Sequence, residues 1–532
     1  YNDVAAVYNQ NRAKVSAIPQ QERVYSDIMR QQNIKEELFL FLLQKKEEKY
    51  MNMATVAPSS KIIDNISVAG VVSPQKMTIL LIFLILGTIF PIIVIKVKDL
   101  LRYQIVTKDE LEKITGVDKN LVKKAAIAYA TAKAAMEFHG LGVTEHYQGT
   151  FTVQLIADLA MITGNVGKKG AGVNPLRGQN NVQGAADMGA QPHQGAGYLD
   201  VTNPEINQHY NQFYGAKVSN QIGFTIPEMF DAAINGDLKA LWIIGEDVVQ
   251  TDPNTQKVMK ALANLELLVV SELFMTETAK MATVILPASS FLEKEGTFTN
   301  GERRIQRVQK VVEPIKGTKP DGQIIVEMMR KMGYDQCDYS ADNILKEISQ
   351  IVPFFAGVKW NELGDNGKQW PVLPDGSDTK MMHVDGFKRG KGKFYFYPFE
   401  ESREVANHGK DFSYIITTNR ELEHYNCGAM TRRTGNVEIL TEDVLLIHPD
   451  DAAKEMINDG DMVCVESPRG KVDIKAKITK EVKPGILSST FHFPEIMLNN
   501  ITSDEHCSEA QCPEYKVVSC RIRKSKGKRV LV

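Results

Sequence analysis

Cysteine is scarce in this chain and is poorly spaced for binding metal. The 532 residues include six cysteines, and no two of them form a C-x-x-C pair. This spacing predicts no cysteine ligands for an iron–sulfur cluster and no structural zinc site. Scattered cysteines fit a reducing compartment better than a disulfide framework.

The chain also lacks an excess of charge of either sign. Its formal net charge is −2, whereas a nucleic-acid-binding protein usually carries a strong basic excess, so we expect no nucleic-acid partner. No segment reads G-x-x-x-x-G-K-[ST], so the machinery of nucleotide phosphoryl transfer is not visible. The chain begins with tyrosine and shows no signal peptide, and we expect it to be a fragment.

The first hundred residues differ in kind from the rest. We interpret residues 1–76 as a helical extracytoplasmic arm, in which Ile34–Tyr50 has the pattern of an amphipathic helix. Met77–Ile95 is 19 residues long and has no charge, which is enough to span a bilayer; the alternative is a buried core helix. Because Lys96 and Lys98 follow it, we expect the C-terminal side to be cytoplasmic.

Residues 116–330 have the pattern of an α/β enzyme. Asp118 can cap a helix over 121–138, and a second helix is predicted over 153–162. Short apolar runs predict strands over 239–244, 267–270 and 282–286. Strands that alternate with helices predict a doubly wound, mainly parallel sheet, in which ligands bind beyond the carboxyl ends of the strands.

The C-terminal part has a different pattern. Residues 331–410 are irregular and are predicted to connect two domains, and residues 411–532 form many short strands typical of a β-barrel. The predicted strands are 412–418, 444–449, 461–467, 471–478 and 485–493. The basic tail 521–529 is predicted to be a solvated end.

The run Thr163–Gly189 is the most informative segment. It holds seven glycines in 27 residues, next to Arg177, Gln179 and two asparagines. Glycine allows positive φ and a close approach of a ligand to the backbone, and carboxamides offer paired donors and acceptors. The run therefore predicts a loop around a large polar cofactor.

This run resembles the molybdenum- or tungsten-dependent formate dehydrogenases, which belong to the bis-molybdopterin guanine dinucleotide oxidoreductases. Further similar stretches follow in the order of that family, at 142–150, 245–253, 276–306, 417–433, 491–502 and 512–516. The resemblance covers residues 115–532. It implies a double-psi type of barrel, a bis-molybdopterin guanine dinucleotide cofactor, and oxidation of formate to CO₂ by hydride transfer to the metal centre. It also implies partner subunits that carry electrons through iron–sulfur clusters.

The resemblance assigns roles to individual residues. Arg177 is expected to hold the formate carboxylate, with support from Gln179; the alternative is a pairing of Arg177 with a cofactor phosphate or a local acid. The expected cofactor-binding residues are Gln148, Gly178, Asn181, Gly245, Glu246, Asp247, Asp252, Thr276, Arg420, His424, Asn499, Tyr515 and Lys516. Ordinary helix capping remains open for the three acids, and solvated loop positions remain open for the last five residues.

The N-terminal part points elsewhere. Ile18–Glu48 and the membrane segment resemble polysaccharide co-polymerases and their tyrosine-kinase relatives, with a junction over 96–115. The family's metal-ligating cysteine or selenocysteine and its [4Fe–4S] region are expected to be missing, and no residue is predicted to ligate the metal. We therefore expect a chimaeric or truncated chain whose cytoplasmic catalytic part is anchored to the inner membrane if the fusion is natural. The alternatives are a membrane-anchored polysaccharide-export protein that carries a passenger, and a non-catalytic cofactor binder.

Overall fold

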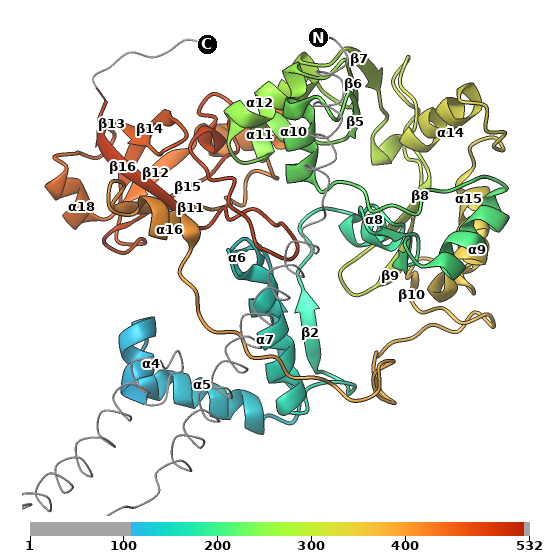
Figure 1. The fold of residues 1–532 in the computed structure, drawn as a ribbon, viewed down its shortest axis with the longest axis horizontal. Coiled ribbons are helices and arrows are strands. Elements are labelled where there is room, and N and C mark those ends of the chain that lie inside the picture. Colours follow the sequence, from blue (N-terminus) through green and yellow to red (C-terminus); the bar gives the residue numbers. More distant parts are fainter. Residues whose placement is uncertain (1–107, 526–532) are drawn as a thin grey trace, which may run out of the picture. The chain divides into compact units, whose positions relative to one another are not determined.

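The computed structural model describes residues 108–525 (Figure 1). The chain divides into two units, 1–102 and 103–532, and every described residue belongs to the second. The predicted arm, the membrane segment 77–95 and most of the junction lie outside the described residues. Within 108–525, no helix has the length and apolar character needed to cross a bilayer.

The described part begins with two helices, α4 (Lys108–Thr115) and α5 (Lys119–Thr131). Asp118 caps α5 as predicted, since its side chain accepts hydrogen bonds from the backbone nitrogens of Asn120 and Leu121. The predicted extension of this helix to Phe138 is wrong. The helix ends because Ala132 is extended (ψ 142°), and the following residues form strand β1 (Met136–His139).

Strand β1 pairs in parallel with β2 (Gly172–Pro175), and the glycine-rich run supplies β2. Between them lie α6 (Leu141–Thr144) and α7 (Gly149–Ile162), which confirms the predicted second helix. After β2 come α8 (Val182–Asp187), the short hairpin β3 (Gln194–Gly195) and β4 (Leu199–Asp200), and α9 (Pro204–Tyr214).

A second parallel sheet contains the three predicted strands, which are confirmed as β5 (Ala240–Ile244), β6 (Leu267–Glu272) and β7 (Val284–Pro287). Its core includes Val258 and Val270, which are fully buried. The strands lie side by side in sequence order, so the double winding stays a prediction. The helices of this region are α10 (Ile226–Asn235), α11 (Val248–Thr251), α12 (Thr255–Ala263) and α13 (Glu277–Lys280).

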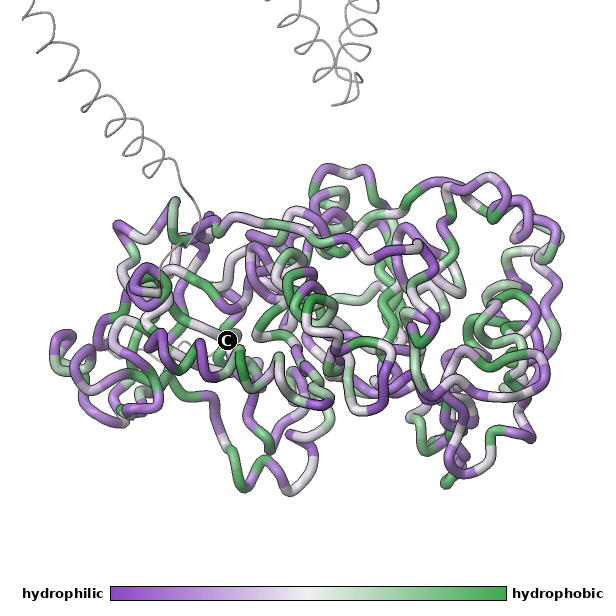
Figure 2. Tube along the Cα trace, turned by 90° about the horizontal axis from the view of Figure 1, so that it is seen from below, coloured by the Kyte–Doolittle hydropathy of each residue, from purple (hydrophilic) through white to green (hydrophobic). Residues whose placement is uncertain are grey.

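A third group of elements surrounds the antiparallel sheet β10-β9-β8. Its core includes Tyr210, Ile305, Val352 and Leu363, so residues of the predicted connecting region 331–410 pack here. The elements are β8 (Gly296–Thr299), β9 (Arg304–Val308), α14 (Asp321–Lys331), α15 (Ala341–Ile351) and β10 (Lys368–Gln369). Hydrophobic stretches recur along the described trace rather than gathering in one part of it, as expected for several separate cores (Figure 2).

The last region is a closed barrel with strand order β11-β15-β12-β14-β13-β16. The five predicted strands are confirmed as β11 (Tyr414–Thr418), β12 (Val444–Ile447), β13 (Met462–Glu466), β14 (Lys471–Ile478) and β15 (Ile486–Ser489). Short helices α16 (Arg403–His408), α17 (Asn436–Ile439) and α18 (Pro449–Lys454) accompany them.

The sixth strand, β16 (Val518–Lys524), closes the barrel. The prediction of a solvated tail is therefore wrong for residues 521–524. Cys520 and Ile522 are buried, whereas Arg521 and Arg523 are exposed, so this half of the strand alternates between core and solvent. The basic residues occupy the outer face, so the alternating apolar pattern of the strand is hard to recognise in the sequence.

One buried ion pair ties α16 to the barrel. Arg469 donates two hydrogen bonds to the Glu404 carboxylate, at 2.9 and 2.6 Å, and the Glu404 side chain is only 1% exposed. The same carboxylate accepts the backbone N–H of Ser519 on β16 at 3.0 Å. Removal of either charge would leave the other without a partner in the interior.

We expect Arg469→Met to destabilise the barrel by about 3–5 kcal/mol, because it leaves Glu404 buried and unpaired. The matched control is Arg521→Met, which breaks the exposed pair with Glu466 and should cost about 0–1 kcal/mol. Urea unfolding of the full chain measures both variants. Equal costs would show that burial does not govern the Arg469 pair.

Candidate cofactor and substrate site

The glycine-rich run serves two purposes. Gly167 has a φ of +69°, and a Cβ there would lie 2.4 Å from the His383 carbonyl oxygen, so packing within the chain requires this glycine. A Cβ at Gly184 would likewise lie 2.1 Å from Asn181 Oδ1. At Gly178, by contrast, no heavy atom lies within 4 Å of an added Cβ. The backbone next to Arg177 is therefore open, as a loop that admits a ligand requires.

The loop that holds Arg177 touches the barrel. The backbone N–H of Asn180 donates to the Tyr425 hydroxyl at 3.1 Å, and Gln179 Nε2 donates to Asn426 Oδ1 at 3.4 Å. Both partners belong to the loop that follows β11. The structure thus brings the predicted Arg177 loop close to the loop that begins near Arg420.

Arg177 is exposed and only partly engaged by the protein. Its Nε–H donates to Gln183 Oε1 at 2.9 Å, and its two terminal nitrogens have no protein partner among residues 108–525. Two free N–H groups on one planar guanidinium match the two oxygens of a carboxylate. The geometry therefore suits a bidentate anion.

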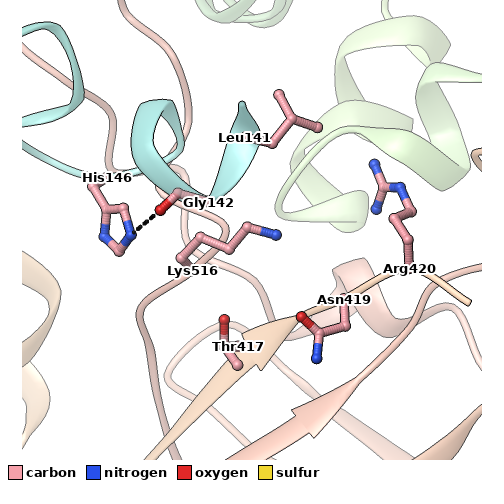
Figure 3. Close-up of a pocket in the computed structure, with 7 residues that line it drawn as sticks. All are labelled: Leu141, Gly142, His146, Thr417, Asn419, Arg420 and Lys516. Carbon is pink, nitrogen blue, oxygen red and sulfur yellow. Dashed lines mark hydrogen bonds between the residues drawn. The ribbon is translucent and has the colours of Figure 1, made fainter. Parts of the chain in front are cut away.

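A pocket of about 430 Å³ lies between α6 and the end of β11 (Figure 3). It is lined by Leu141, Gly142, His146, Thr417, Asn419, Arg420 and Lys516. The Lys516 ammonium donates to the Thr418 carbonyl at 2.6 Å and lies 3.3 Å from the Glu145 carboxylate. With two cationic side chains at its wall, the pocket suits a polar anionic ligand.

Burial sets the electrostatics of this pocket. Desolvation lowers the pKa of Arg420 and of Lys516, although nearby Glu145 opposes the shift in both. Burial also raises the pKa of Glu145, against the attraction of Lys516. The Arg420 guanidinium lies 4.0 Å from the centre of the Phe491 ring, a cation–π contact that holds it at the pocket rim.

His146 lines the pocket, although it was not predicted as a site residue. Its Nε2 lies 3.0 Å from the Gly142 carbonyl oxygen, and burial lowers its pKa. Its position inside the motif 142–150 was the available signal.

Asp247, which follows β5, and Thr276, which follows β6, both accept hydrogen bonds at the start of α13. Asp247 accepts the backbone N–H and the hydroxyl of Thr278, at 2.8 and 2.7 Å. Thr276 accepts the backbone N–H of Ala279 at 3.2 Å at the start of α13. Asp247 makes no side-chain cap hydrogen bond to its own helix, α11, whereas Thr276 is the N-cap of α13.

Asp252 and Glu246 differ from these two residues. The Asp252 carboxyl is buried and accepts one hydrogen bond, from the Thr251 hydroxyl at 3.1 Å. Burial, followed by the charge of Glu246, raises its pKa to about 8. Burial and the Asp247 charge raise the pKa of Glu246. Acceptors with so few protein donors are suited to the N–H and O–H groups of a ligand. Gly245, with a φ of +66° and open space around it, precedes them.

The buried side chains of Asn499 and Gln250 and the half-buried Tyr515 join the barrel to the turn α11. Asn499 Nδ2 donates to the carbonyls of Gln250 and Thr251, at 2.7 and 3.0 Å, and the Tyr515 hydroxyl donates to the Thr251 carbonyl at 3.0 Å. Gln250 Nε2 donates in return to the carbonyls of Cys427 and Phe491, both at 3.0 Å. Gln250 escaped prediction, although it stands in the motif 245–253.

The remaining predicted residues are bonded to the protein itself. Gln148 bonds the backbone of Pro398 and Glu400, and Asn181 Oδ1 accepts the Thr299 N–H at 3.0 Å. Both ring nitrogens of His424 have protein partners, which are the Thr431 hydroxyl and the Leu440 carbonyl. These side chains hold the segments around the site in place.

His492, which sequence reasoning missed, orders the loop that follows β11. Its Nε2 accepts the Glu421 N–H at 3.0 Å, so its Nδ1–H donates to the Asn426 carbonyl. Burial lowers its pKa to about 4, which keeps this ring neutral near pH 7.

The described part joins an α/β unit to a closed barrel, and the pocket next to the barrel is lined by the cationic side chains Arg420 and Lys516. The molybdopterin oxidoreductase family matches residues 61–331, and the molydopterin dinucleotide binding domain matches residues 414–519. The chain therefore belongs to the molybdopterin oxidoreductase family. The first match begins inside the part that we interpreted as an arm.

Similar curated proteins include the F420-dependent formate dehydrogenase subunit alpha of Methanocaldococcus jannaschii, 41% identical over 81% of this chain and 64% of that protein. Formate dehydrogenase H of Escherichia coli is 36% identical over 78% of this chain and 59% of its own length. The chain thus spans about three fifths of these relatives. Acetylene hydratase from Pelobacter acetylenicus shares the fold, with a TM-score of 0.57 and 17% identity over 79% of this chain and 64% of that one.

We expect Asp252→Asn to change how stability depends on pH. Because the folded pKa of about 8 lies above the unfolded value near 3.8, the native state holds this proton more tightly. The contribution of this proton to the free energy of unfolding is complete below pH 3.8 and is lost as the pH rises to about 8. Over this range the free energy of unfolding falls by up to about 1.4 kcal/mol per pH unit. Urea unfolding at pH 5 and pH 8 should show a smaller difference for the variant than for the wild type. If the variant and the wild type showed the same difference in free energy of unfolding between pH 5 and pH 8, a raised pKa of Asp252 would be contradicted.

Proposed function

We propose that this chain is the cofactor- and formate-binding part of a formate dehydrogenase-like oxidoreductase that uses bis-molybdopterin guanine dinucleotide with molybdenum or tungsten. The observation that carries the proposal is the Arg177 guanidinium, which has two free nitrogens beside the open backbone of Gly178. The relatives named as formate dehydrogenases support the choice of substrate.

The residues present fit such a cofactor. Arg420 and Lys516 would hold phosphate oxygens at the wall of the pocket, and the buried Asp252 carboxyl would accept N–H groups of guanine or ribose hydroxyls. Glu246 would add a second acceptor at the same strand end. When bound, the cofactor would supply a metal centre that accepts the proton and the two electrons of the formate C–H bond as CO₂ leaves.

The chain's own part in the reaction is positioning. Arg177 would hold both oxygens of formate, which turns the C–H bond in one direction and lowers the entropic cost of reaction. Its positive charge would attract the anion from solvent. Gln179 would keep the loop against the barrel through Asn426, so that substrate and cofactor sites stay together.

We expect the chain, purified from a host that makes the cofactor, to contain guanine nucleotide and either molybdenum or tungsten. The double variant Arg420→Ala with Lys516→Ala should bind the nucleotide about 100-fold more weakly, because two charged hydrogen-bond donors are lost. Arg177→Gln should keep the nucleotide. Acid release and chromatography measure guanine, with the exposed Arg330→Ala as control. A wild-type chain free of guanine would contradict cofactor binding.

We also propose that the purified chain does not oxidise formate alone. The resemblance implies a cysteine or selenocysteine that ligates the metal and precedes the matched motifs, and the first 336 residues contain no cysteine. The measurement is formate-dependent dye reduction by cofactor-loaded protein. Rapid dye reduction would contradict this expectation, and retained cofactor without reduction fits the non-catalytic binder as well.

The hypotheses of a membrane anchor, of partner electron-transfer subunits and of a polysaccharide-export role stay proposals. The membrane segment and the co-polymerase resemblance lie outside residues 108–525.

A further inference from the structure

A hydrogen-bond network that the proposed function leaves unused lies behind Arg177. Gln183, on α8, accepts from Arg177 Nε and donates its Nε2 hydrogens to Asp187 Oδ1 and to the Tyr198 hydroxyl, each at 2.9 Å. Tyr198 donates to the same Asp187 oxygen at 2.7 Å. Asp187 is fully buried, and its other oxygen, Oδ2, has no hydrogen-bond partner within residues 108–525.

The chemistry of the partners settles which way the Gln183 amide points. Tyr198 donates its only hydroxyl hydrogen to Asp187, so the hydroxyl oxygen can only accept from Gln183. Asp187 Oδ1 also accepts. The NH₂ end of Gln183 must therefore face these two residues. Any proton on Asp187 would lie on Oδ2 and would leave this pattern unchanged.

The carbonyl end of Gln183 consequently faces Arg177. An arginine Nε–H that donates to a fixed acceptor holds the plane of its guanidinium. One terminal N–H runs parallel to Nε–H, and the edge between the two terminal nitrogens faces away from the acceptor. Since those two nitrogens have no protein partner in the described part, the network orients the edge that is open to an anion.

We propose that Gln183 is a positioning residue that fixes the guanidinium plane of Arg177 for bidentate formate binding, and that Asp187 and Tyr198 fix Gln183. The proposal rests on the proposed function for its ligand, but not for the orientation of the guanidinium. A purely structural network would affect stability and would leave both the Arg177 Nε–H and anion affinity unchanged.

The test uses the full chain with arginine labelled at Nε with ¹⁵N, in which Arg177→Lys identifies the Arg177 signal by its loss. In Gln183→Leu we expect Nε–H exchange at Arg177 to be about tenfold faster, and the formate dissociation constant, titrated on the same signal, to rise about tenfold. Gln183→Asn is the milder second variant, because the shorter amide cannot reach both Arg177 and Asp187.

The matched control is Gln323→Leu. Gln323 also donates to an acid four residues further along a helix, Glu327, at 2.9 Å, but it lies on α14. It should leave both readings unchanged. Thermal unfolding of each variant reports any general loss of fold.

The outcomes separate the two claims. Unchanged Nε–H exchange in both Gln183 variants overturns the proposal, and so does faster exchange with unchanged formate affinity. Faster exchange without formate binding in any form, the wild type included, supports the orientation of Arg177 and overturns the proposed substrate.

Discussion

The seating of the barrel on the turn α11 is the contact on which the site depends. Gln250 and Asn499 are buried at this junction and Tyr515 is half-buried, and each makes hydrogen bonds to backbone carbonyls of the other part. A buried polar group without a partner costs about 1–3 kcal/mol, so the two parts fit in one arrangement only. Tyr515 precedes Lys516, and this seating therefore also places the ammonium group in the pocket.

The same seating explains why the site holds charges that its protein surroundings do not stabilise. Burial raises the pKa of Asp252 and Glu145 and lowers that of Lys516. Such shifts mark positions where the folded chain gives up stability, and they concentrate where ligands bind. The barrel core shows the contrast, since Glu404 and Arg469 neutralise each other without a ligand.

Much of the fold could be predicted from periodicity, and the failures have physical causes. The strands of the parallel sheet and five barrel strands are continuous or alternating apolar runs, which local patterns report. The predicted extension of the helix to Phe138 was wrong because alanines favour a helix locally. Pairing of Met136–His139 with the distant strand β2 makes this segment a strand instead. Strand β16 was not predicted because its outward-facing arginines resemble a solvated tail.

The site residues, too, could be predicted only in part from the sequence. Residue type and motif order pointed to Arg177, Arg420, Lys516 and Asp252. In the described part, the terminal nitrogens of Arg177 have no protein partner, and the Asp252 carboxyl accepts a single hydrogen bond. Arg420 and Lys516 line the pocket. Residue type and motif order could not separate these from Asp247 and Thr276, which accept hydrogen bonds at the start of α13, because a cap and a ligand contact need the same acceptor. Gln183, Gln250 and His492 were missed, since each acts through backbone or side chains whose proximity exists only in the folded chain.

The glycine-rich run shows how a single loop couples Arg177 to the barrel. Its glycines permit tight packing at Gly167 and Gly184, which fixes the ends of the loop, while Gly178 leaves the middle open. Asn180 and Gln179 then attach that middle to the barrel loop, which His492 holds from the other side. Any shift of the barrel loop must therefore move the backbone that carries Arg177. An arginine whose Nε–H is bound to Gln183, on a loop attached to the barrel, presents its two terminal nitrogens in a restricted orientation.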